Sequence, residues 1–182
     1  MLKALFSRYL DGFERTWGYD ASYMRALLAA STGSFFKFTF VTRLADHKAA
    51  PAEAMAAAGI VGTLAGDCGP CVQISADMAA AGGVAPDVLR AILTGDEAGM
   101  GETAALVWRF ARASLARDME ACDPLRDEIV SRWGHAGLTA ISLQLTTARM
   151  YPTLKCALGY GKTCSKVVVA GVAAVAQPAL AA

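Results

Sequence analysis

The spacing of hydrophobic side chains predicts helices along most of the chain, with almost no alternating strand pattern. In the first 20 residues, hydrophobic side chains recur at helical intervals, which predicts an amphipathic helix packed on a core or a sister subunit. These side chains are Leu2, Leu5, Phe6, Tyr9, Phe13 and Trp17. Proline and glycine delimit the helices that follow. We expect these at 51–66, 68–81, 85–95, 102–119, 123–134 and 138–151, the last of them ending before Pro152.

Two cysteines stand where one of these helices begins, in the segment "GDCGPCVQISADMAAAGG" at 66–83. Asp67 is the predicted helix cap, because a carboxylate accepts hydrogen bonds from the free backbone N–H groups of a first turn. Cys68 and Cys71 then fall in that turn, and the two glycines at 82 and 83 end the helix. Both thiols are thus expected beside the positive end of a helix dipole.

Composition is consistent with one packed domain. The 182 residues are 55% hydrophobic and 18% charged, which suits a well-buried globular chain rather than a disordered one. With no linker or internal repeat, we expect a single all-α domain over 1–182, a bundle of about seven or eight helices. A chain with so many hydrophobic and so few charged residues is also expected to bury part of its apolar surface against further copies of itself, which predicts a homo-oligomer.

Charge and targeting features narrow the classes of partner. Seventeen basic residues against sixteen acidic ones leave a net charge of +1, which gives no drive toward nucleic acid. The N-terminal segment lacks the apolar stretch of a signal peptide, and five cysteines form an odd set, so reducing cytoplasm is expected. The apolar C-terminal stretch is too short for a membrane span, and none is predicted.

The distribution of charge is uneven. No acidic residue occurs from Ile129 to Ala182, whereas five basic residues do: Arg132, Arg149, Lys155, Lys162 and Lys166. We favour a solvated rim or helix C-terminal cations as the explanation. A surface that faces an anion is the alternative.

Three interpretations of Cys68 and Cys71 are open. Side chains three residues apart on a helix are neighbours, so the sulfurs can close a disulfide, and the helix start favours the reactive thiolate. The pair is alternatively two small apolar side chains that fill space in the core. A zinc site would need two further ligands, and Cys156 and Cys164 are spaced too far apart for the usual motif. We favour redox chemistry and expect neither a metal nor a cofactor.

The segment "DCGPCVQISADMAAAGGVAPDVLRAILTGDEAGMGETAALVWRFARAS" resembles the carboxymuconolactone decarboxylase superfamily, in particular its alkyl hydroperoxidase D-like branch. The shared features are a CxxC at a helix start, an alanine-rich helix, a Gly-Val break, a short helix and a long helix with aromatic residues. The likeness covers about 53–150. It implies an all-α bundle that forms homo-oligomers, with Cys71 as the peroxidatic thiol and Cys68 as the resolving one.

The chain departs from this family at two positions of the proton relay. A histidine normally lies four residues after the second cysteine, where this chain has Ser75. A glutamate normally lies twelve residues before the first cysteine, where this chain has Ala56, and Glu53 one turn earlier is a partial substitute. The histidines of the chain, His47 and His135, lie outside the motif and are interpreted as loop or interhelix residues.

Two functions follow from this pattern. The first is a thiol oxidoreductase or peroxidase that reduces small-molecule hydroperoxides or disulfides with Cys71 and Cys68, supported by Ser75 or Glu53 and recycled by an unidentified thiol reductant. The alternative is a non-catalytic oligomeric member of the same family that binds a small ligand or partner.

Overall fold

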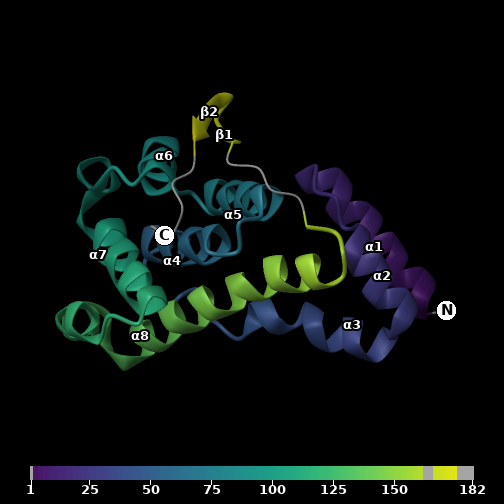
Figure 1. Ribbon diagram of the computed structural model, residues 1–182, viewed down its shortest axis with the longest axis horizontal. Helices are drawn as coiled ribbons and strands as arrows, with labels where there is room; N and C mark the ends of the chain where they lie inside the picture. Colours follow the sequence, from purple (N-terminus) through teal and green to yellow (C-terminus); the bar gives the residue numbers. More distant parts are fainter. Residues whose placement is uncertain (1, 162–165, 176–182) are drawn as a thin grey trace.

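The computed structural model describes residues 2–161 and 166–175, and in them the chain is an all-α bundle with one short hairpin (Figure 1). The all-α prediction is confirmed. The described elements are α1 (Leu2–Trp17), α2 (Ser22–Ala30), α3 (Thr32–Thr39), a 3-10 turn (Val41–Arg43), α4 (Ala52–Leu64), α5 (Gly69–Ala81), α6 (Pro86–Thr94), α7 (Glu97–Ala116), α8 (Met119–Ala157), β1 (Lys166–Val169) and β2 (Val172–Val175).

Helix α4 is the centre of the main hydrophobic cluster, with α7, α8 and α5 packed around it. Small residues within α4 and just after its end let α8 approach closely. A Cβ on Gly62 would lie 2.8 Å from the carbonyl oxygen of Leu145, and one on Gly66 would lie 2.4 Å from Cβ of Pro152. Both distances are shorter than a van der Waals contact, so the glycines set the α4–α8 spacing.

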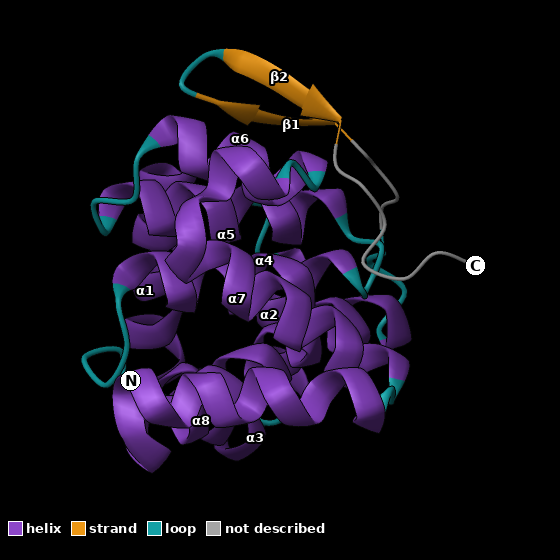
Figure 2. Cartoon of the chain, turned by 90° about the vertical axis from the view of Figure 1, so that its left-hand side faces the viewer, coloured by secondary structure: helices purple, strands orange, loops and turns teal. Residues whose placement is uncertain are grey.

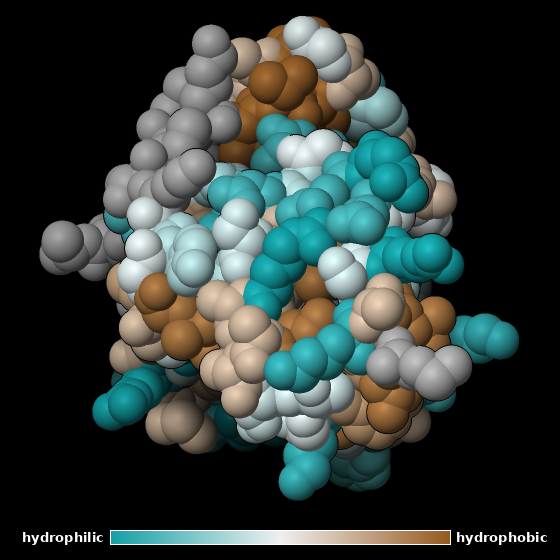
Figure 3. Space-filling model, turned by 90° about the vertical axis from the view of Figure 1, so that its right-hand side faces the viewer, coloured by the Kyte–Doolittle hydropathy of each residue, from teal (hydrophilic) through white to brown (hydrophobic). Residues whose placement is uncertain are grey.

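The N-terminal helices form a second, separate hydrophobic cluster on the right of Figure 1. The amphipathic helix predicted there is α1. Arg25 of α2 binds it through a 2.7 Å ion pair to Asp11 and a second ion pair to Glu14. Viewed from this side, Figure 3 shows hydrophobic residues interleaved with hydrophilic ones at the surface. The exposed hydrophobic side chains of this region include Leu2, Leu5, Tyr9, Phe36 and Phe40.

In the C-terminal half of the bundle, the observed helices extend beyond some of the predicted boundaries. Segment α7 begins with a short turn at Glu97, where Asp96 caps it by accepting from the backbone N–H of Gly99. Gly101 (φ 70°, ψ 162°) breaks this turn from the long helix, which starts at Glu102 as predicted. Segment α8 is broken at Gly134 (φ 67°, ψ −178°), where the prediction ends a helix, but its second part continues past Pro152, where the prediction is wrong. The ring of Pro152 is buried in the space that Gly66 leaves open, which holds the proline within the helix.

The hairpin was not predicted. Its strands pair antiparallel with Val169 opposite Val172, and Ala170 and Gly171 take the two positive φ angles (50° and 77°) of a type I′ turn. Gln73 of α5 holds it, since its side chain accepts from the N–H of Val168 at 2.8 Å and donates to the carbonyl of Val168 at 2.9 Å. The hairpin therefore lies across the outer side of the bundle, near α6 (Figure 2). Among the described residues, no helix is long and apolar enough to cross a membrane.

Candidate functional site

The cysteine pair lies at the N-terminus of α5, but one residue earlier than predicted. Cys68 is the residue before the helix, with extended backbone angles, and Cys71 is the third residue within it. Asp67 does not cap the helix: it occupies a left-handed turn (φ 45°) between α4 and α5, a conformation that aspartate tolerates better than most residues. The N–H of Cys71 donates to the carbonyl of Cys68 at 2.9 Å, which closes the first turn.

Both thiols are free and buried, with exposed fractions of 4% for Cys68 and 1% for Cys71. The hydrogen bond from the Cys71 thiol lowers the pKa of Cys68 to about 6; burial opposes this shift, while the backbone N–H of Cys71 and the charge of Lys155 add to it. The same hydrogen bond, together with burial, raises the pKa of Cys71. The pair thus shares one proton, with the resting thiolate on Cys68.

Lys155 is a cation in the last turn of α8, as one of its interpretations expects, but it is buried beside this pair and is not part of a solvated rim. It lies near the end of α8 with 1% of its surface exposed, and its Nζ has no hydrogen-bond partner. Nζ lies 4.7 Å from the ring centroid of Tyr19 and 5.6 Å from that of Tyr23. Its positive charge lowers the pKa of both cysteines, so it stabilises a thiolate there.

A cavity of about 420 Å³ is lined in part by Cys71, between the N-terminal helices and α4, α5 and α8. This volume falls within the usual range for small-molecule sites. Most of its walls are apolar, with hydroxyl and amide groups interspersed. Its lining residues are Phe13, Tyr19, Tyr23, Thr42, His47, Ala52, Met55, Ala56, Thr63, Cys71, Ile74, Ser75, Met78, Ala79, Gly82, Val84, Gln144, Thr147, Ala148 and Tyr151.

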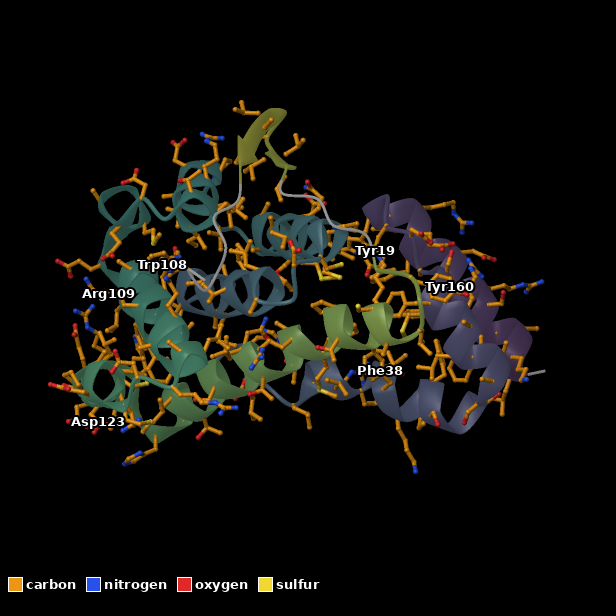
Figure 4. The ribbon with its side chains drawn as sticks, viewed as in Figure 1. Tyr19, Phe38, Trp108, Arg109, Asp123 and Tyr160 are labelled. Carbon is orange, nitrogen blue, oxygen red and sulfur yellow. The ribbon has the colours of Figure 1, made fainter. Side chains whose placement is uncertain are left out.

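Tyr19 joins the N-terminal helices to the thiols. It follows the left-handed turn at Gly18 (φ 58°) after α1, and its hydroxyl lies 3.7 Å from the sulfur of Cys71. Figure 4 shows its side chain in the space between the N-terminal helices and α5. Burial raises the pKa of Tyr19 far above its ordinary value, and the neighbouring Tyr23 and Cys71 add to the shift, so the phenol stays protonated.

The structure brings only some of the predicted site residues together. Ser75 lines the same cavity as Cys71, one helical turn away, and Ala56 lines it from α4. Glu53 is half-buried on α4 and is not among the lining residues. His47, interpreted as a loop residue, lies exposed at the cavity, with Nε2 3.4 Å from the carbonyl of Thr42.

Sequence reasoning missed Tyr19 and the position of Lys155. Tyr19 is 52 residues from Cys71, and no local spacing connects them. The absence of acidic residues after Ile129 was a signal for Lys155, since no carboxylate in that segment competes for its charge.

The zinc interpretation finds no support in the part of the chain that the structure describes. It contains no group of three or more His, Cys, Asp or Glu side chains placed to hold a metal. Cys156 is exposed near the end of α8, and Cys164 lies outside the described residues.

Comparison with protein-family models, with curated proteins and with solved structures gives no match for this chain. The resemblance to the carboxymuconolactone decarboxylase superfamily therefore stays a prediction, based on the motif residues themselves.

Proposed function

We propose that the protein is a thiol-dependent oxidoreductase that uses Cys68 and Cys71 to reduce hydroperoxides or disulfides. The observation that carries this proposal is the placement of the pair: two adjacent free thiols share a proton beside a buried, unpartnered lysine, and one of them opens into a cavity. A pair that only filled space would need neither the cation nor the cavity.

The cavity supports different roles for the two sulfurs. Cys71 lines it and is the sulfur that a substrate reaches, whereas Cys68 is not among the lining residues. The Cys71 proton can pass along the hydrogen bond to the Cys68 thiolate, which makes Cys71 the nucleophile at the moment of attack. This agrees with the roles that the family resemblance implies, Cys71 as the peroxidatic thiol and Cys68 as the resolving one.

With a hydroperoxide ROOH, the Cys71 thiolate attacks the terminal oxygen, the O–O bond breaks, and Cys71 becomes a sulfenic acid while RO⁻ leaves as ROH. Cys68 then attacks the Cys71 sulfur, forms the disulfide and releases water. The two thiols supply both electrons, and one solvent proton balances the resting thiolate. A thiol or dithiol reductant must then reduce the disulfide to complete a cycle.

With a disulfide substrate, Cys71 attacks one sulfur and forms a mixed disulfide, which Cys68 resolves by releasing the second thiol. This route needs less proton delivery, because a thiolate is a far better leaving group than an alkoxide. It suits a site that has Ser75 where a histidine relay is expected.

The alternative function is a non-catalytic oligomeric protein that binds an apolar ligand in the cavity. The mainly apolar lining and the hydrophobic side chains exposed on α1 and beside α3 favour it. In that case Cys71 is only part of the cavity wall, and Cys68 only fills space in the core.

A single-turnover experiment decides between the two functions. The fully reduced protein is mixed with one equivalent of tert-butyl hydroperoxide or of an aromatic disulfide, and the Cys68–Cys71 disulfide is quantified by peptide mass spectrometry. We expect disulfide in step with substrate consumption, and none in the Cys71→Ser variant. Consumption of neither oxidant would leave the binding function.

A further inference from the structure

The Tyr19 hydroxyl is the polar side-chain group placed on the cavity-facing sulfur. It lies 3.7 Å from Sγ of Cys71, and both residues line the same cavity. The tyrosine is buried, with 8% of its surface exposed, and comes from the turn between α1 and α2, not from the helix that carries the cysteines. Either atom can donate in this bond, but once Cys71 passes its proton to Cys68, the Tyr19 O–H is the group left to donate to the Cys71 sulfur.

Peroxide reduction needs a proton at this position. When the sulfur attacks the terminal oxygen, charge develops on the leaving oxygen, which becomes a strongly basic alkoxide unless it is protonated. Ser75 lines the cavity one turn farther along α5, whereas the Tyr19 hydroxyl lies at the Cys71 sulfur itself. A donor next to the attacking sulfur is close to the leaving oxygen as well, since only the O–O bond separates that oxygen from the one attacked.

The environment of Tyr19 suits a proton donor that exists as a phenolate only briefly. Burial keeps the phenol protonated before the reaction, so it can give a proton but cannot act as a base. Lys155 Nζ lies 4.7 Å from its ring centroid without a hydrogen-bond partner of its own. That positive charge stabilises the phenolate formed when the proton leaves.

We propose that Tyr19 is the catalytic proton donor to the leaving oxygen, in place of the histidine relay that this chain lacks; this inference rests on the proposed function. Cys71 sulfur bonds to the terminal oxygen of ROOH, the O–O bond breaks, and RO⁻ takes the Tyr19 proton to leave as ROH. The Tyr19 phenolate then takes a proton from solvent, and Cys68 displaces hydroxide from the sulfenic acid, which leaves as water with the proton held by Cys68.

Leaving-group dependence tests the proposal. The Tyr19→Phe variant removes one oxygen atom and keeps the ring that packs beneath Lys155. Single-turnover disulfide formation is measured at pH 7 with tert-butyl hydroperoxide, whose alkoxide needs a proton, and with peracetic acid, whose acetate does not. We expect Tyr19→Phe to slow the first reaction about 10²-fold and the second less than about threefold, because a positioned acid contributes roughly that much.

Tyr151→Phe is the matched control. Tyr151 lines the same cavity, but its hydroxyl bonds to Thr42 and not to a thiol. A change in cavity shape or access alters both oxidants together, so this variant is expected to keep the ratio of the two rates. An equal loss with both oxidants in Tyr19→Phe, or no loss, overturns the role of Tyr19. Failure of the unmodified protein to react with either oxidant rejects the proposed function instead.

A second variant tests the proposal if the Tyr19→Phe protein does not fold. Replacement of Tyr19 by 3-fluorotyrosine keeps the hydroxyl and ring but makes the phenol more acidic. We expect the tert-butyl hydroperoxide rate to rise relative to the peracetic acid rate, since a stronger acid protonates the alkoxide earlier. An unchanged ratio overturns the proposal.

Discussion

Replacing the buried lysine separates its cost to stability from its benefit to the thiols. In Lys155→Met a flexible apolar side chain of similar length takes the place of an unpartnered buried ammonium group. Burying an unpaired charge is unfavourable, so we expect the free energy of unfolding to stay the same or increase. The Cys68 thiolate, in contrast, loses a positive neighbour.

The size of the second effect follows from the charges around Cys68. An opposite charge within about 4–6 Å shifts a pKa by roughly 1–3 units. Lys155 ranks behind the two hydrogen bonds from Cys71 among the causes that lower the pKa of Cys68, so we take about one unit, equivalent to about 1.4 kcal/mol. The pKa of Cys68 would then rise from about 6 to about 7, and the thiolate fraction at pH 6 would fall about fivefold.

Alkylation by iodoacetamide between pH 5 and 9, followed by peptide mass spectrometry, measures this shift directly. We expect the midpoint of the Cys68 profile to move up by about one unit in Lys155→Met, with the rates converging above pH 8. Arg149→Met is the control, since it removes an exposed cation from the same helix. An unmoved midpoint in Lys155→Met, or an equal movement in Arg149→Met, would refute the role assigned to the buried charge.

Three further predictions test the rest of the site and the packing. Ser75→His should raise the single-turnover hydroperoxide rate across pH 6 to 8, and a folded variant that is no faster contradicts the relay position. Gly62→Ala should lower the free energy of unfolding by about 1–3 kcal/mol in urea, whereas Gly33→Ala, with nothing near the added Cβ, should not. Light scattering at micromolar concentration should give the mass of a homo-oligomer; a monomer mass contradicts this.

Local patterns were sufficient for the helices that carry the site. Proline, glycine and alanine place α4, α5 and α6 within a few residues of their observed bounds, because capping and helix propensity act over short distances. The hairpin was missed because its valine-rich strands are short and their partner across the surface, Gln73, lies 95 residues earlier. The continuation of α8 through Pro152 depends on the gap at Gly66, which only packing reveals.

The sequence predicts that the two cysteines can form a disulfide, but not which of the two sulfurs holds the proton. The spacing of Cys68 and Cys71 predicts a pair that can form a disulfide, and both sulfurs lie at the start of α5. Which sulfur holds the proton depends on the direction of the hydrogen bond between them and on Lys155 from α8. Contacts between distant segments decide that, and the spacing of residues along one sequence does not encode such contacts.

The boundary between the two hydrophobic clusters also affects how fast a reagent from solvent can reach Cys71. Ile74 of α5 and Tyr151 and Leu154 of α8 pack on the N-terminal cluster, while the core around α4 belongs to the other cluster. Separating α1–α3 from the bundle would therefore uncover Cys71 at a smaller free-energy cost than global unfolding. A thiol reagent too bulky for the cavity would then report how often these N-terminal helices open, and amide hydrogen exchange in α1–α3 would follow the same opening.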